Sequence, residues 1–325
     1  MIDYKNGIYA VDSDYVRPIL DAIHLVEDSG EVAIVDCAHN DAWPQVEAAL
    51  AQIGRKPEDV EWLILTHVHL DHAGGAGLFM SKLPNAKLVV HERGARHMIE
   101  PSKLYAGVEV VYGKETAKRL YGELLPIAES RVLIGRHGDK ITIGQRTLEI
   151  LDTPGHARHH IAIVDHTAKA IFSGDTFGLS YRELDVDGQA FIFPTTTPVN
   201  FEPDAMHDSI ELMRSFKPSG IYLTHYSRVT EVETLADDLH RHIDALVEMT
   251  NKAPGEGEAR KQAIEAAMTE YLLKEVRTHG CTLPEHEIKA IFETDLDLNS
   301  QGLNYWREQE EKREKQREKN QGAAH

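Results

Sequence analysis

The 325 residues of this chain are enough for one large domain or for one domain with an extension, and a 42% hydrophobic content is typical of a globular protein. Its 35 Lys and Arg face 53 Asp and Glu, and the formal net charge of -18 argues against nucleic acid or an anionic membrane as the main partner. Only two cysteines occur, far apart in the sequence, so we expect no disulfide framework and a cytoplasmic location.

The first third of the chain is predicted to contain both strands and helices. A helix is expected from residue 43 to residue 53, where the apolar spacing is helical and Gly54 follows. The glycine pair Gly74-Gly75 leads into a second helix. Apolar runs of strand length predict buried strands. These runs cover residues 23–26, 32–35, 62–65 and 88–90.

The middle of the chain first favours helices and then strands. Residues 92–128 are expected to be mostly helical, with breaks at Pro101 and Gly113. Residues 176–203 form a long irregular segment, and its apolar content favours a functional loop. A helix is expected around residues 206–213. Further strands are predicted at residues 141–143, 148–150, 161–164, 170–172 and 221–223.

After about residue 229 the apolar residues follow helical spacing only. The segment Ala253-Pro254-Gly255 separates the first of these stripes from the next. Residues 307–319 are almost all charged or Gln, which is typical of a solvated helix or a disordered end. We therefore expect a catalytic domain over residues 1–250 and a helical C-terminal extension with a charged tail over residues 251–325.

A cluster of metal-ligand side chains follows the predicted strand at residues 62–65, in the sequence His67-Val68-His69-Leu70-Asp71-His72. On an extended backbone His67 and His69 point the same way and can reach one ion, whereas Asp71 and His72 follow where the chain turns. Imidazole nitrogens and carboxylate oxygens are ligands for Zn²⁺, Fe²⁺ and Mn²⁺. Burying these side chains without a partner would be costly, so the cluster predicts a metal site.

Three more candidate ligands each follow a predicted strand: His156, Asp175 and His225. Ligands at the ends of strands on one sheet edge can converge although they are far apart in sequence. A lone histidine after a strand is more often structural or solvated than a ligand, so each of the three is weak evidence by itself.

Taken together, the motifs HVHLDH, TPGH, SGDT and LTHY, in this order, resemble the metallo-β-lactamase superfamily over about residues 7–228. Asp36, at the end of Ala33-Ile34-Val35-Asp36, matches the first motif of that superfamily. The resemblance implies an α+β fold, an αββα metallo-β-lactamase sandwich with metals at one edge between two sheets.

The same resemblance implies a role for each candidate ligand. It implies two divalent metal ions, zinc by default with iron or manganese also accepted by these ligands. The first metal would be bound by His67, His69 and His156, the second by Asp71, His72 and His225, and Asp175 would bridge both. Asp36 and His160 would lie behind the ligands and orient them, and His159 is assigned to the surface or to a pocket wall.

Two adjacent dications make a bridging hydroxide available at neutral pH, and Asp71 is the best candidate to orient it and to move its proton. Tyr226, next to a ligand, and Tyr181, in the long loop, are candidate catalytic donors to a developing oxyanion. Simple packing explains both tyrosines equally well.

Departures from individual branches narrow the predicted function. The commonest class B β-lactamases carry Cys where this chain has Asp175, and the flavodiiron branch has Glu in place of His69. The chain is most similar to the glyoxalase II and lactonase branch, which implies a hydrolase of a small ester, thioester or lactone. Two alternatives stay open: an oxidoreductase similar to the mononuclear iron persulfide dioxygenases, and a regulatory protein without catalytic turnover. The expected partners are a small-molecule substrate and, through the helical extension, a second copy in a homodimer.

Overall fold

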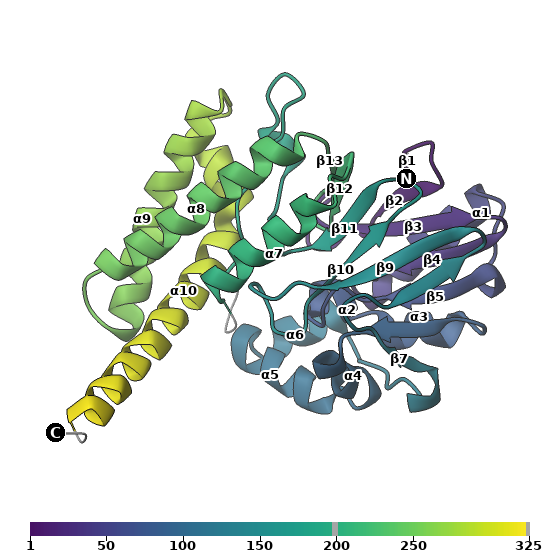
Figure 1. Ribbon diagram of the computed structural model, residues 1–325, viewed down its shortest axis with the longest axis horizontal. Coiled ribbons are helices and arrows are strands. Elements are labelled where there is room, and N and C mark those ends of the chain that lie inside the picture. The colour runs from purple at the N-terminus through teal and green to yellow at the C-terminus, as the bar shows by residue number, and fades with distance from the viewer. Residues whose placement is uncertain (197–200, 323–325) are drawn as a thin grey trace.

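Two β-sheets pack face to face, and helices cover both outer faces (Figure 1). The computed structural model describes residues 1–196 and 201–322. The predicted α+β fold, an αββα sandwich followed by C-terminal helices, is confirmed. Within the described residues, no helix combines the length and the apolar character that a membrane crossing requires.

The first sheet has the order β1-β2-β3-β4-β5-β6-β7. Neighbouring strands are antiparallel from β1 to β4 and parallel from β4 to β7. Its strands are β1 (Ile2–Asp3), β2 (Ile8–Asp12), β3 (Ala22–Asp28), β4 (Glu31–Val35), β5 (Val60–Ile64), β6 (Lys87–Val90) and β7 (Val132–Ile134).

The second sheet has the order β13-β12-β11-β10-β9-β8. Only β11 and β12 are parallel among its paired strands, so β9, β11 and β12 all run in one direction. Its strands are β8 (Lys140–Ile143), β9 (Arg146–Asp152), β10 (Ile161–Asp165), β11 (Ala170–Gly174), β12 (Gly220–Leu223) and β13 (Ser227–Val229).

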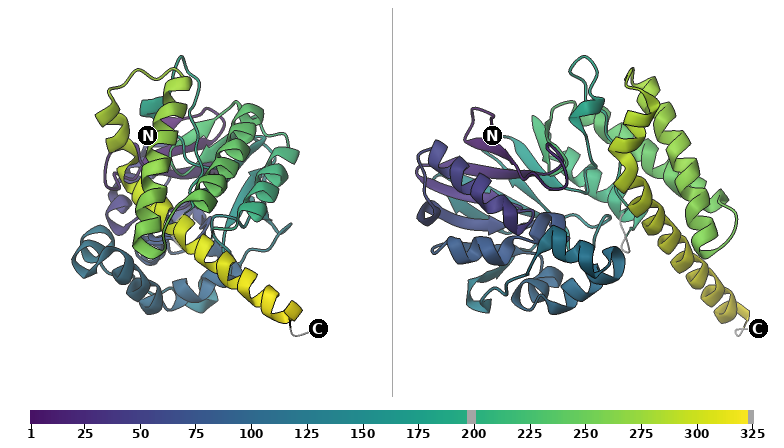
Figure 2. Two further views of the ribbon diagram at one scale, coloured as in Figure 1. Left: turned by 90° about the vertical axis from the view of Figure 1, so that its left-hand side faces the viewer. Right: turned by 180° about the vertical axis from the view of Figure 1, so that it is seen from behind.

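Two sets of helices enclose the sheets (Figures 1 and 2). On the side of the first sheet lie α1 (Trp43–Gln52), α2 (Leu70–Ala73), α3 (Ala76–Lys82), α4 (Glu92–Ile99), α5 (Ser102–Tyr112) and α6 (Lys114–Tyr121). On the side of the second sheet lie α7 (Pro203–Ser215), α8 (Val232–Lys252), α9 (Gly257–Thr278) and α10 (Glu285–Gly322). Short 3-10 turns occupy Asn40–Ala42, Pro57–Asp59, Glu129–Arg131 and Arg182–Leu184.

Apolar side chains fill three layers. Between the sheets, Ile64 and Val89 of the first sheet pack with Ile163 and Phe172 of the second. The outer face of the first sheet packs on α1, α3 and α4, and the outer face of the second packs on α7 to α10. Burying one large apolar side chain stabilises the fold by about 1.5–3 kcal/mol, and the sum of these contributions holds the sheets and the helices together.

Several local expectations differ from the structure. The helix expected up to residue 128 ends at Tyr121, because Gly122 takes a positive φ of 61° and the chain then crosses α3 without regular secondary structure. Gly77 of α3 permits that crossing, since a Cβ there would lie 2.0 Å from the carbonyl oxygen of Leu125. The short strands β1, β2 and β13 were not predicted. The charged residues 307–319 form the outer part of α10, which projects from the body (Figure 2).

Candidate metal centre

The predicted ligands meet at one edge of the sandwich because each follows the C-terminal end of a strand. His67 and His69 follow β5, and the single turn of α2 then carries Asp71 and His72. The remaining three follow strands of the second sheet that run in one direction: His156 after β9, Asp175 after β11 and His225 after β12. The structure therefore brings all seven predicted ligands together.

These side chains form three overlapping groups in which the ligand atoms lie within 4.8 Å of one another. The first is His67, His69 and His156; the second is His67, His72 and Asp175; the third is Asp71, His72 and His225. In the first group, His69 Nδ1 lies 2.9 Å from His67 Nε2 and 3.0 Å from His156 Nε2. Ligands of one tetrahedral zinc ion lie about 3.3 Å apart, so this group fits one ion.

Asp175 lies between the outer groups and presents one oxygen to each. Its Oδ2 is 3.5 Å from His156 Nε2 and 4.0 Å from His67 Nε2. Its Oδ1 is 3.2 Å from His72 Nε2 and 3.6 Å from His225 Nε2. Asp175 Oδ1 and His72 Nε2 are buried and have no hydrogen-bond partner among the described residues. Two buried polar atoms that face each other in this way fit the ligands of a shared cation.

The electrostatics of the cluster agree with a cation-binding role. Burial and the neighbouring His72 and His69 hold the pKa of His67 well below its usual value. Burial and His156 lower the pKa of His69 to about 3. Both imidazoles are therefore neutral near pH 7, which is the form that binds a metal. Burial raises the pKa of Asp175, but the nearby histidines outweigh it and hold that pKa well below its usual value.

Asp36 joins three strand ends directly behind the ligands. Its carboxylate accepts hydrogen bonds from His72 Nδ1 at 2.8 Å, from the backbone N–H of Thr66 at 2.8 Å and from the hydroxyl of Thr224 at 2.9 Å. Burial lowers the pKa of His72, but Asp175, Asp71 and Asp36 outweigh it and raise that pKa well above its usual value in the metal-free chain. A metal that displaces the proton on Nε2 would leave the other proton on Nδ1, where Asp36 accepts it. The predicted orienting role of Asp36 agrees with these contacts.

His160 and Asp21 also lie behind the ligands. His160 Nε2 accepts a hydrogen bond from the backbone N–H of Asp175 at 3.1 Å, so it positions that residue as expected. Asp21 Oδ1 lies 2.7 Å from His225 Nδ1 and is 1% exposed. The sequence analysis missed Asp21, because it precedes β3 without a motif, and only the fold brings it to His225.

Among the described hydrogen bonds, ion pairs and ring contacts, none joins the side chain of either candidate catalytic tyrosine to these ligands, although Tyr226 directly follows His225 in the chain. The hydroxyl of Tyr181 donates to Asp295 of α10 at 3.0 and 3.2 Å, and the guanidinium of Arg17 lies 4.9 Å above its ring. Tyr226 packs against Ala10 and Ala22. Burial raises the pKa of Tyr226 well above its usual value. A catalytic role for either tyrosine stays a prediction, and their contacts are those of packed side chains.

Comparison with known proteins agrees with this geometry. The family model described as "Metallo-beta-lactamase superfamily" matches residues 22–225, which contain all seven candidate ligands. The chain belongs to the metallo-β-lactamase superfamily. A solved archaeal member of this superfamily from Sulfolobus tokodaii superposes with a TM-score of 0.60 at 20% identity, covering 84% of this chain and 99% of that one. At that identity the likeness shows the fold alone.

Two curated relatives of this superfamily protein carry hydrolase names. A hydroxyacylglutathione hydrolase from Stenotrophomonas maltophilia is 31% identical over 47% of this chain and 44% of its own length. An acyl-coenzyme A thioesterase from Gallus gallus is 30% identical over 34% of this chain and 40% of its own length. The chain thus spans less than half the length of either relative, and the hydrolase names support a hydrolase without specifying its substrate.

Proposed function

We propose that this protein is a metal-dependent hydrolase that cleaves a small ester, thioester or lactone with two divalent cations, zinc in the first instance. The observation that carries the proposal is Asp175, whose two oxygens face two different sets of imidazole nitrogens. One metal would be held by His67, His69 and His156, the other by Asp71, His72 and His225, and Asp175 would bridge them.

When bound, the two cations would supply Lewis acidity, which activates water and polarises the acyl carbonyl. Asp71 is the ligand side chain best placed to act on water, because 27% of it is exposed whereas His72 is fully buried. Its Oδ2 lies 3.6 Å from His225 Nε2, so the carboxylate is held at the mouth of the cluster. We assign it the orientation of the attacking water and the acceptance of its proton.

Among the three substrate types, we place thioesters first. The two hydrolase-named relatives act, by name, on an acylglutathione and on an acyl-coenzyme A, and both compounds are thioesters. We also propose a reducing, cytoplasmic setting, which agrees with the two buried free cysteines Cys37 and Cys281.

The test combines metal content with turnover. The purified chain is analysed for Zn, Fe and Mn and assayed against acyl thioesters and lactones, beside His67→Ala, Asp175→Ala and the exposed control His286→Ala. We expect about two metals per chain, thioester or lactone hydrolysis, and loss of both in the first two variants only.

Two results would contradict the proposal. One iron per chain with oxygen consumption on a persulfide would support the oxidoreductase alternative. Two metals without turnover of any ester, thioester or lactone would support a regulatory protein.

Replacing Tyr181 or Tyr226 by Phe tests their catalytic roles, and a fall in kcat of about 100-fold at unchanged metal content would support them.

A further inference from the structure

A pocket opens beside the candidate metal centre, between α4 and the turn that follows β9. It has a volume of about 520 Å³ and is lined by Glu92, Arg93, Arg96, His97, Arg158 and His159. Arg93, Arg96 and His97 share one face of α4 because residues three and four apart on a helix are neighbours. Arg158 and His159 come from the segment that also carries the ligand His156.

His159 forms the wall between this pocket and the metal ligands. Its ring centre lies 5.6 Å from that of His69 and 6.1 Å from that of His67. Gly94 allows α4 to approach the segment that carries His67 and His69, since a Cβ at Gly94 would lie 2.8 Å from a methyl group of Val68. A molecule in the pocket therefore lies next to the candidate site of reaction.

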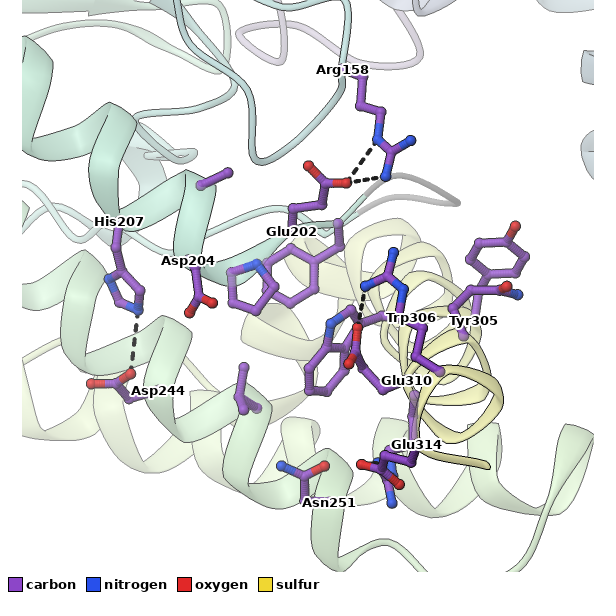
Figure 3. A pocket seen from close by; sticks show the side chains of 17 residues that line it. Arg158, Glu202, Asp204, His207, Asp244, Asn251, Tyr305, Trp306, Glu310 and Glu314 are labelled. Atoms are coloured by element: carbon purple, nitrogen blue, oxygen red, sulfur yellow. Dashed lines mark hydrogen bonds and ion pairs between the residues drawn. The ribbon is translucent and has the colours of Figure 1, made fainter. Parts of the chain in front are cut away.

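The pocket is cationic although the chain carries a formal net charge of -18. Arg93 and Arg96 are exposed and have no carboxylate within 4.0 Å in the part of the chain that the structure describes. Arg158 is paired with Glu202, with 2.7 Å between Nε and the carboxylate (Figure 3). Two guanidinium groups without a carboxylate partner, beside a third, attract anions locally, whatever the net charge of the surface.

We propose that Arg93 and Arg96, with the Glu202-paired Arg158 beside them, bind an anionic group of the substrate, a phosphate or a carboxylate, while the scissile acyl bond lies at the candidate metal centre. The planar guanidinium fork matches both anions and binds them through paired hydrogen bonds. This assignment rests on the proposed hydrolase function and adds the charge of the substrate to it.

The region beyond Arg158 has room for the rest of a large substrate. Arg158 also lines a cavity of about 730 Å³ between α7, α8 and α10, in which Trp306 and Tyr305 are exposed to the space (Figure 3). Phe201 packs edge-on against Trp306 with ring centres 6.0 Å apart. Because Glu202, Asp204, Asp244, Glu310 and Glu314 also line this cavity, its space suits an uncharged part of a larger substrate, with the anionic group kept at the arginines.

The test compares three thioesters that differ in the place of their negative charge. Butyryl-coenzyme A carries phosphates on the thiol part, glutaryl-N-acetylcysteamine carries a carboxylate on the acyl part, and butyryl-N-acetylcysteamine is neutral. They are assayed with the metal-loaded protein, with Arg96→Glu, with Arg93→Ala/Arg96→Ala, and with Arg317→Glu in the projecting end of α10 as the charge-matched control.

We expect KM for one of the anionic thioesters to rise about 10- to 100-fold in both pocket variants, because each lost charge-assisted contact costs at least a factor of about ten. KM for the neutral thioester should change less than about threefold, and Arg317→Glu should behave as the original chain. Raising the salt concentration should increase KM for the anionic thioester only, because salt screens its attraction to the arginines. A selective effect on the coenzyme A ester locates the anion on the thiol part, and one on the glutaryl ester locates it on the acyl part.

Equal changes for neutral and anionic thioesters, or no change for either, would overturn the assignment. If the original chain hydrolyses no thioester, calorimetric binding of free coenzyme A and of glutarate still tests the pocket. Binding that Arg96→Glu weakens at least tenfold, and Arg317→Glu does not, supports the anion site even then. Absence of any binding overturns it independently of the proposed activity.

Discussion

Replacing Asp36 by Asn changes one atom and should separate metal binding from folding. The backbone N–H of Thr66 donates to Oδ1 of Asp36 and can donate only to an oxygen, so the Asn carbonyl must take that position. The Asn NH₂ group then replaces Oδ2, which accepts from His72 Nδ1 at 2.8 Å. A donor there favours the other tautomer of His72, with its proton on Nε2, the atom that faces Asp175 Oδ1.

The size of the effect is set mainly by the contact with His72, because the hydroxyls of Thr66 and Thr224, which also donate to Oδ2, can rotate and accept from the introduced NH₂ group instead. A hydrogen bond to a charged group contributes about 1.5–3 kcal/mol, and losing a partner behind a metal ligand typically weakens metal binding by about 10- to 100-fold, or about 1.4–2.7 kcal/mol. In the metal-free protein the cost is smaller, because His72 can accept from the introduced amide and donate from Nε2 to Asp175. We therefore expect a Tm of the metal-free variant close to that of the original chain.

The assay is a metal competition with a chromogenic chelator, together with a thermal melt of the metal-free protein. Thr224→Val is the matched control, because the hydroxyl of Thr224 donates to the same oxygen of Asp36 but does not contact His72 by any described hydrogen bond. Its metal affinity should stay within about threefold. Metal binding by Asp36→Asn as tight as in the original chain, at the same stoichiometry, would refute the role given to Asp36.

Three further predictions concern stability. Removing the metal by chelation should lower Tm by roughly 8 °C. A metal at about 1,000 times its Kd adds about 4 kcal/mol to the free energy of unfolding, and each kcal/mol shifts Tm by about 2 °C. An unchanged melting curve after verified metal removal would contradict this prediction. Asp165→Ala should lower the free energy of unfolding, measured in urea, by about 3–5 kcal/mol, because it leaves buried Arg146 without the carboxylate that lies 2.7 Å away. A decrease below about 1 kcal/mol would contradict this prediction. Burial raises the pKa of Asp295 from 3.8 to about 7. Between these two pH values the native carboxyl keeps a proton that the unfolded chain releases, so the free energy of unfolding should fall as the pH rises from 3.8 to about 7. Asp295→Asn should flatten this fall, by up to about 4 kcal/mol, and an unchanged pH dependence would contradict it.

The candidate metal ligands could be predicted from the sequence because four of them form one local cluster and the other three stand in motifs that resemble those of a known superfamily. His67, His69, Asp71 and His72 lie within six consecutive residues, and the fold places each remaining candidate ligand shortly beyond a strand that its apolar run already predicts. The parallel direction of β9, β11 and β12 then brings these strand ends to one edge. The convergence of His156, Asp175 and His225 with this cluster is a long-range feature, and it was predicted through the resemblance to the metallo-β-lactamase superfamily.

The residues that the sequence analysis missed depend on contacts between distant segments. Asp21 is 204 positions from His225, which it contacts, and Asp295 is 114 positions from Tyr181. Each is one carboxylate in a chain with 53 Asp and Glu, and no spacing marks it. Arg93 and Arg96 lie in a helix of ordinary polar composition, and their position beside His159 follows only from how α4 packs on the metal loop.

The helical extension is the part of the fold whose role changes most between sequence and structure. The predicted domain limit at residue 250 falls near the end of α8 and stays a prediction, yet one apolar core joins Leu223 of β12 and Leu239 of α8 to Ile264 of α9 and Phe292 of α10. Asp295, one turn beyond Phe292, accepts the hydrogen bond of Tyr181 in the loop that follows Asp175. Since α10 both closes this core and holds the loop beside the candidate ligand Asp175, substitutions in its inner half should affect the candidate metal centre, whereas its projecting end should tolerate substitution.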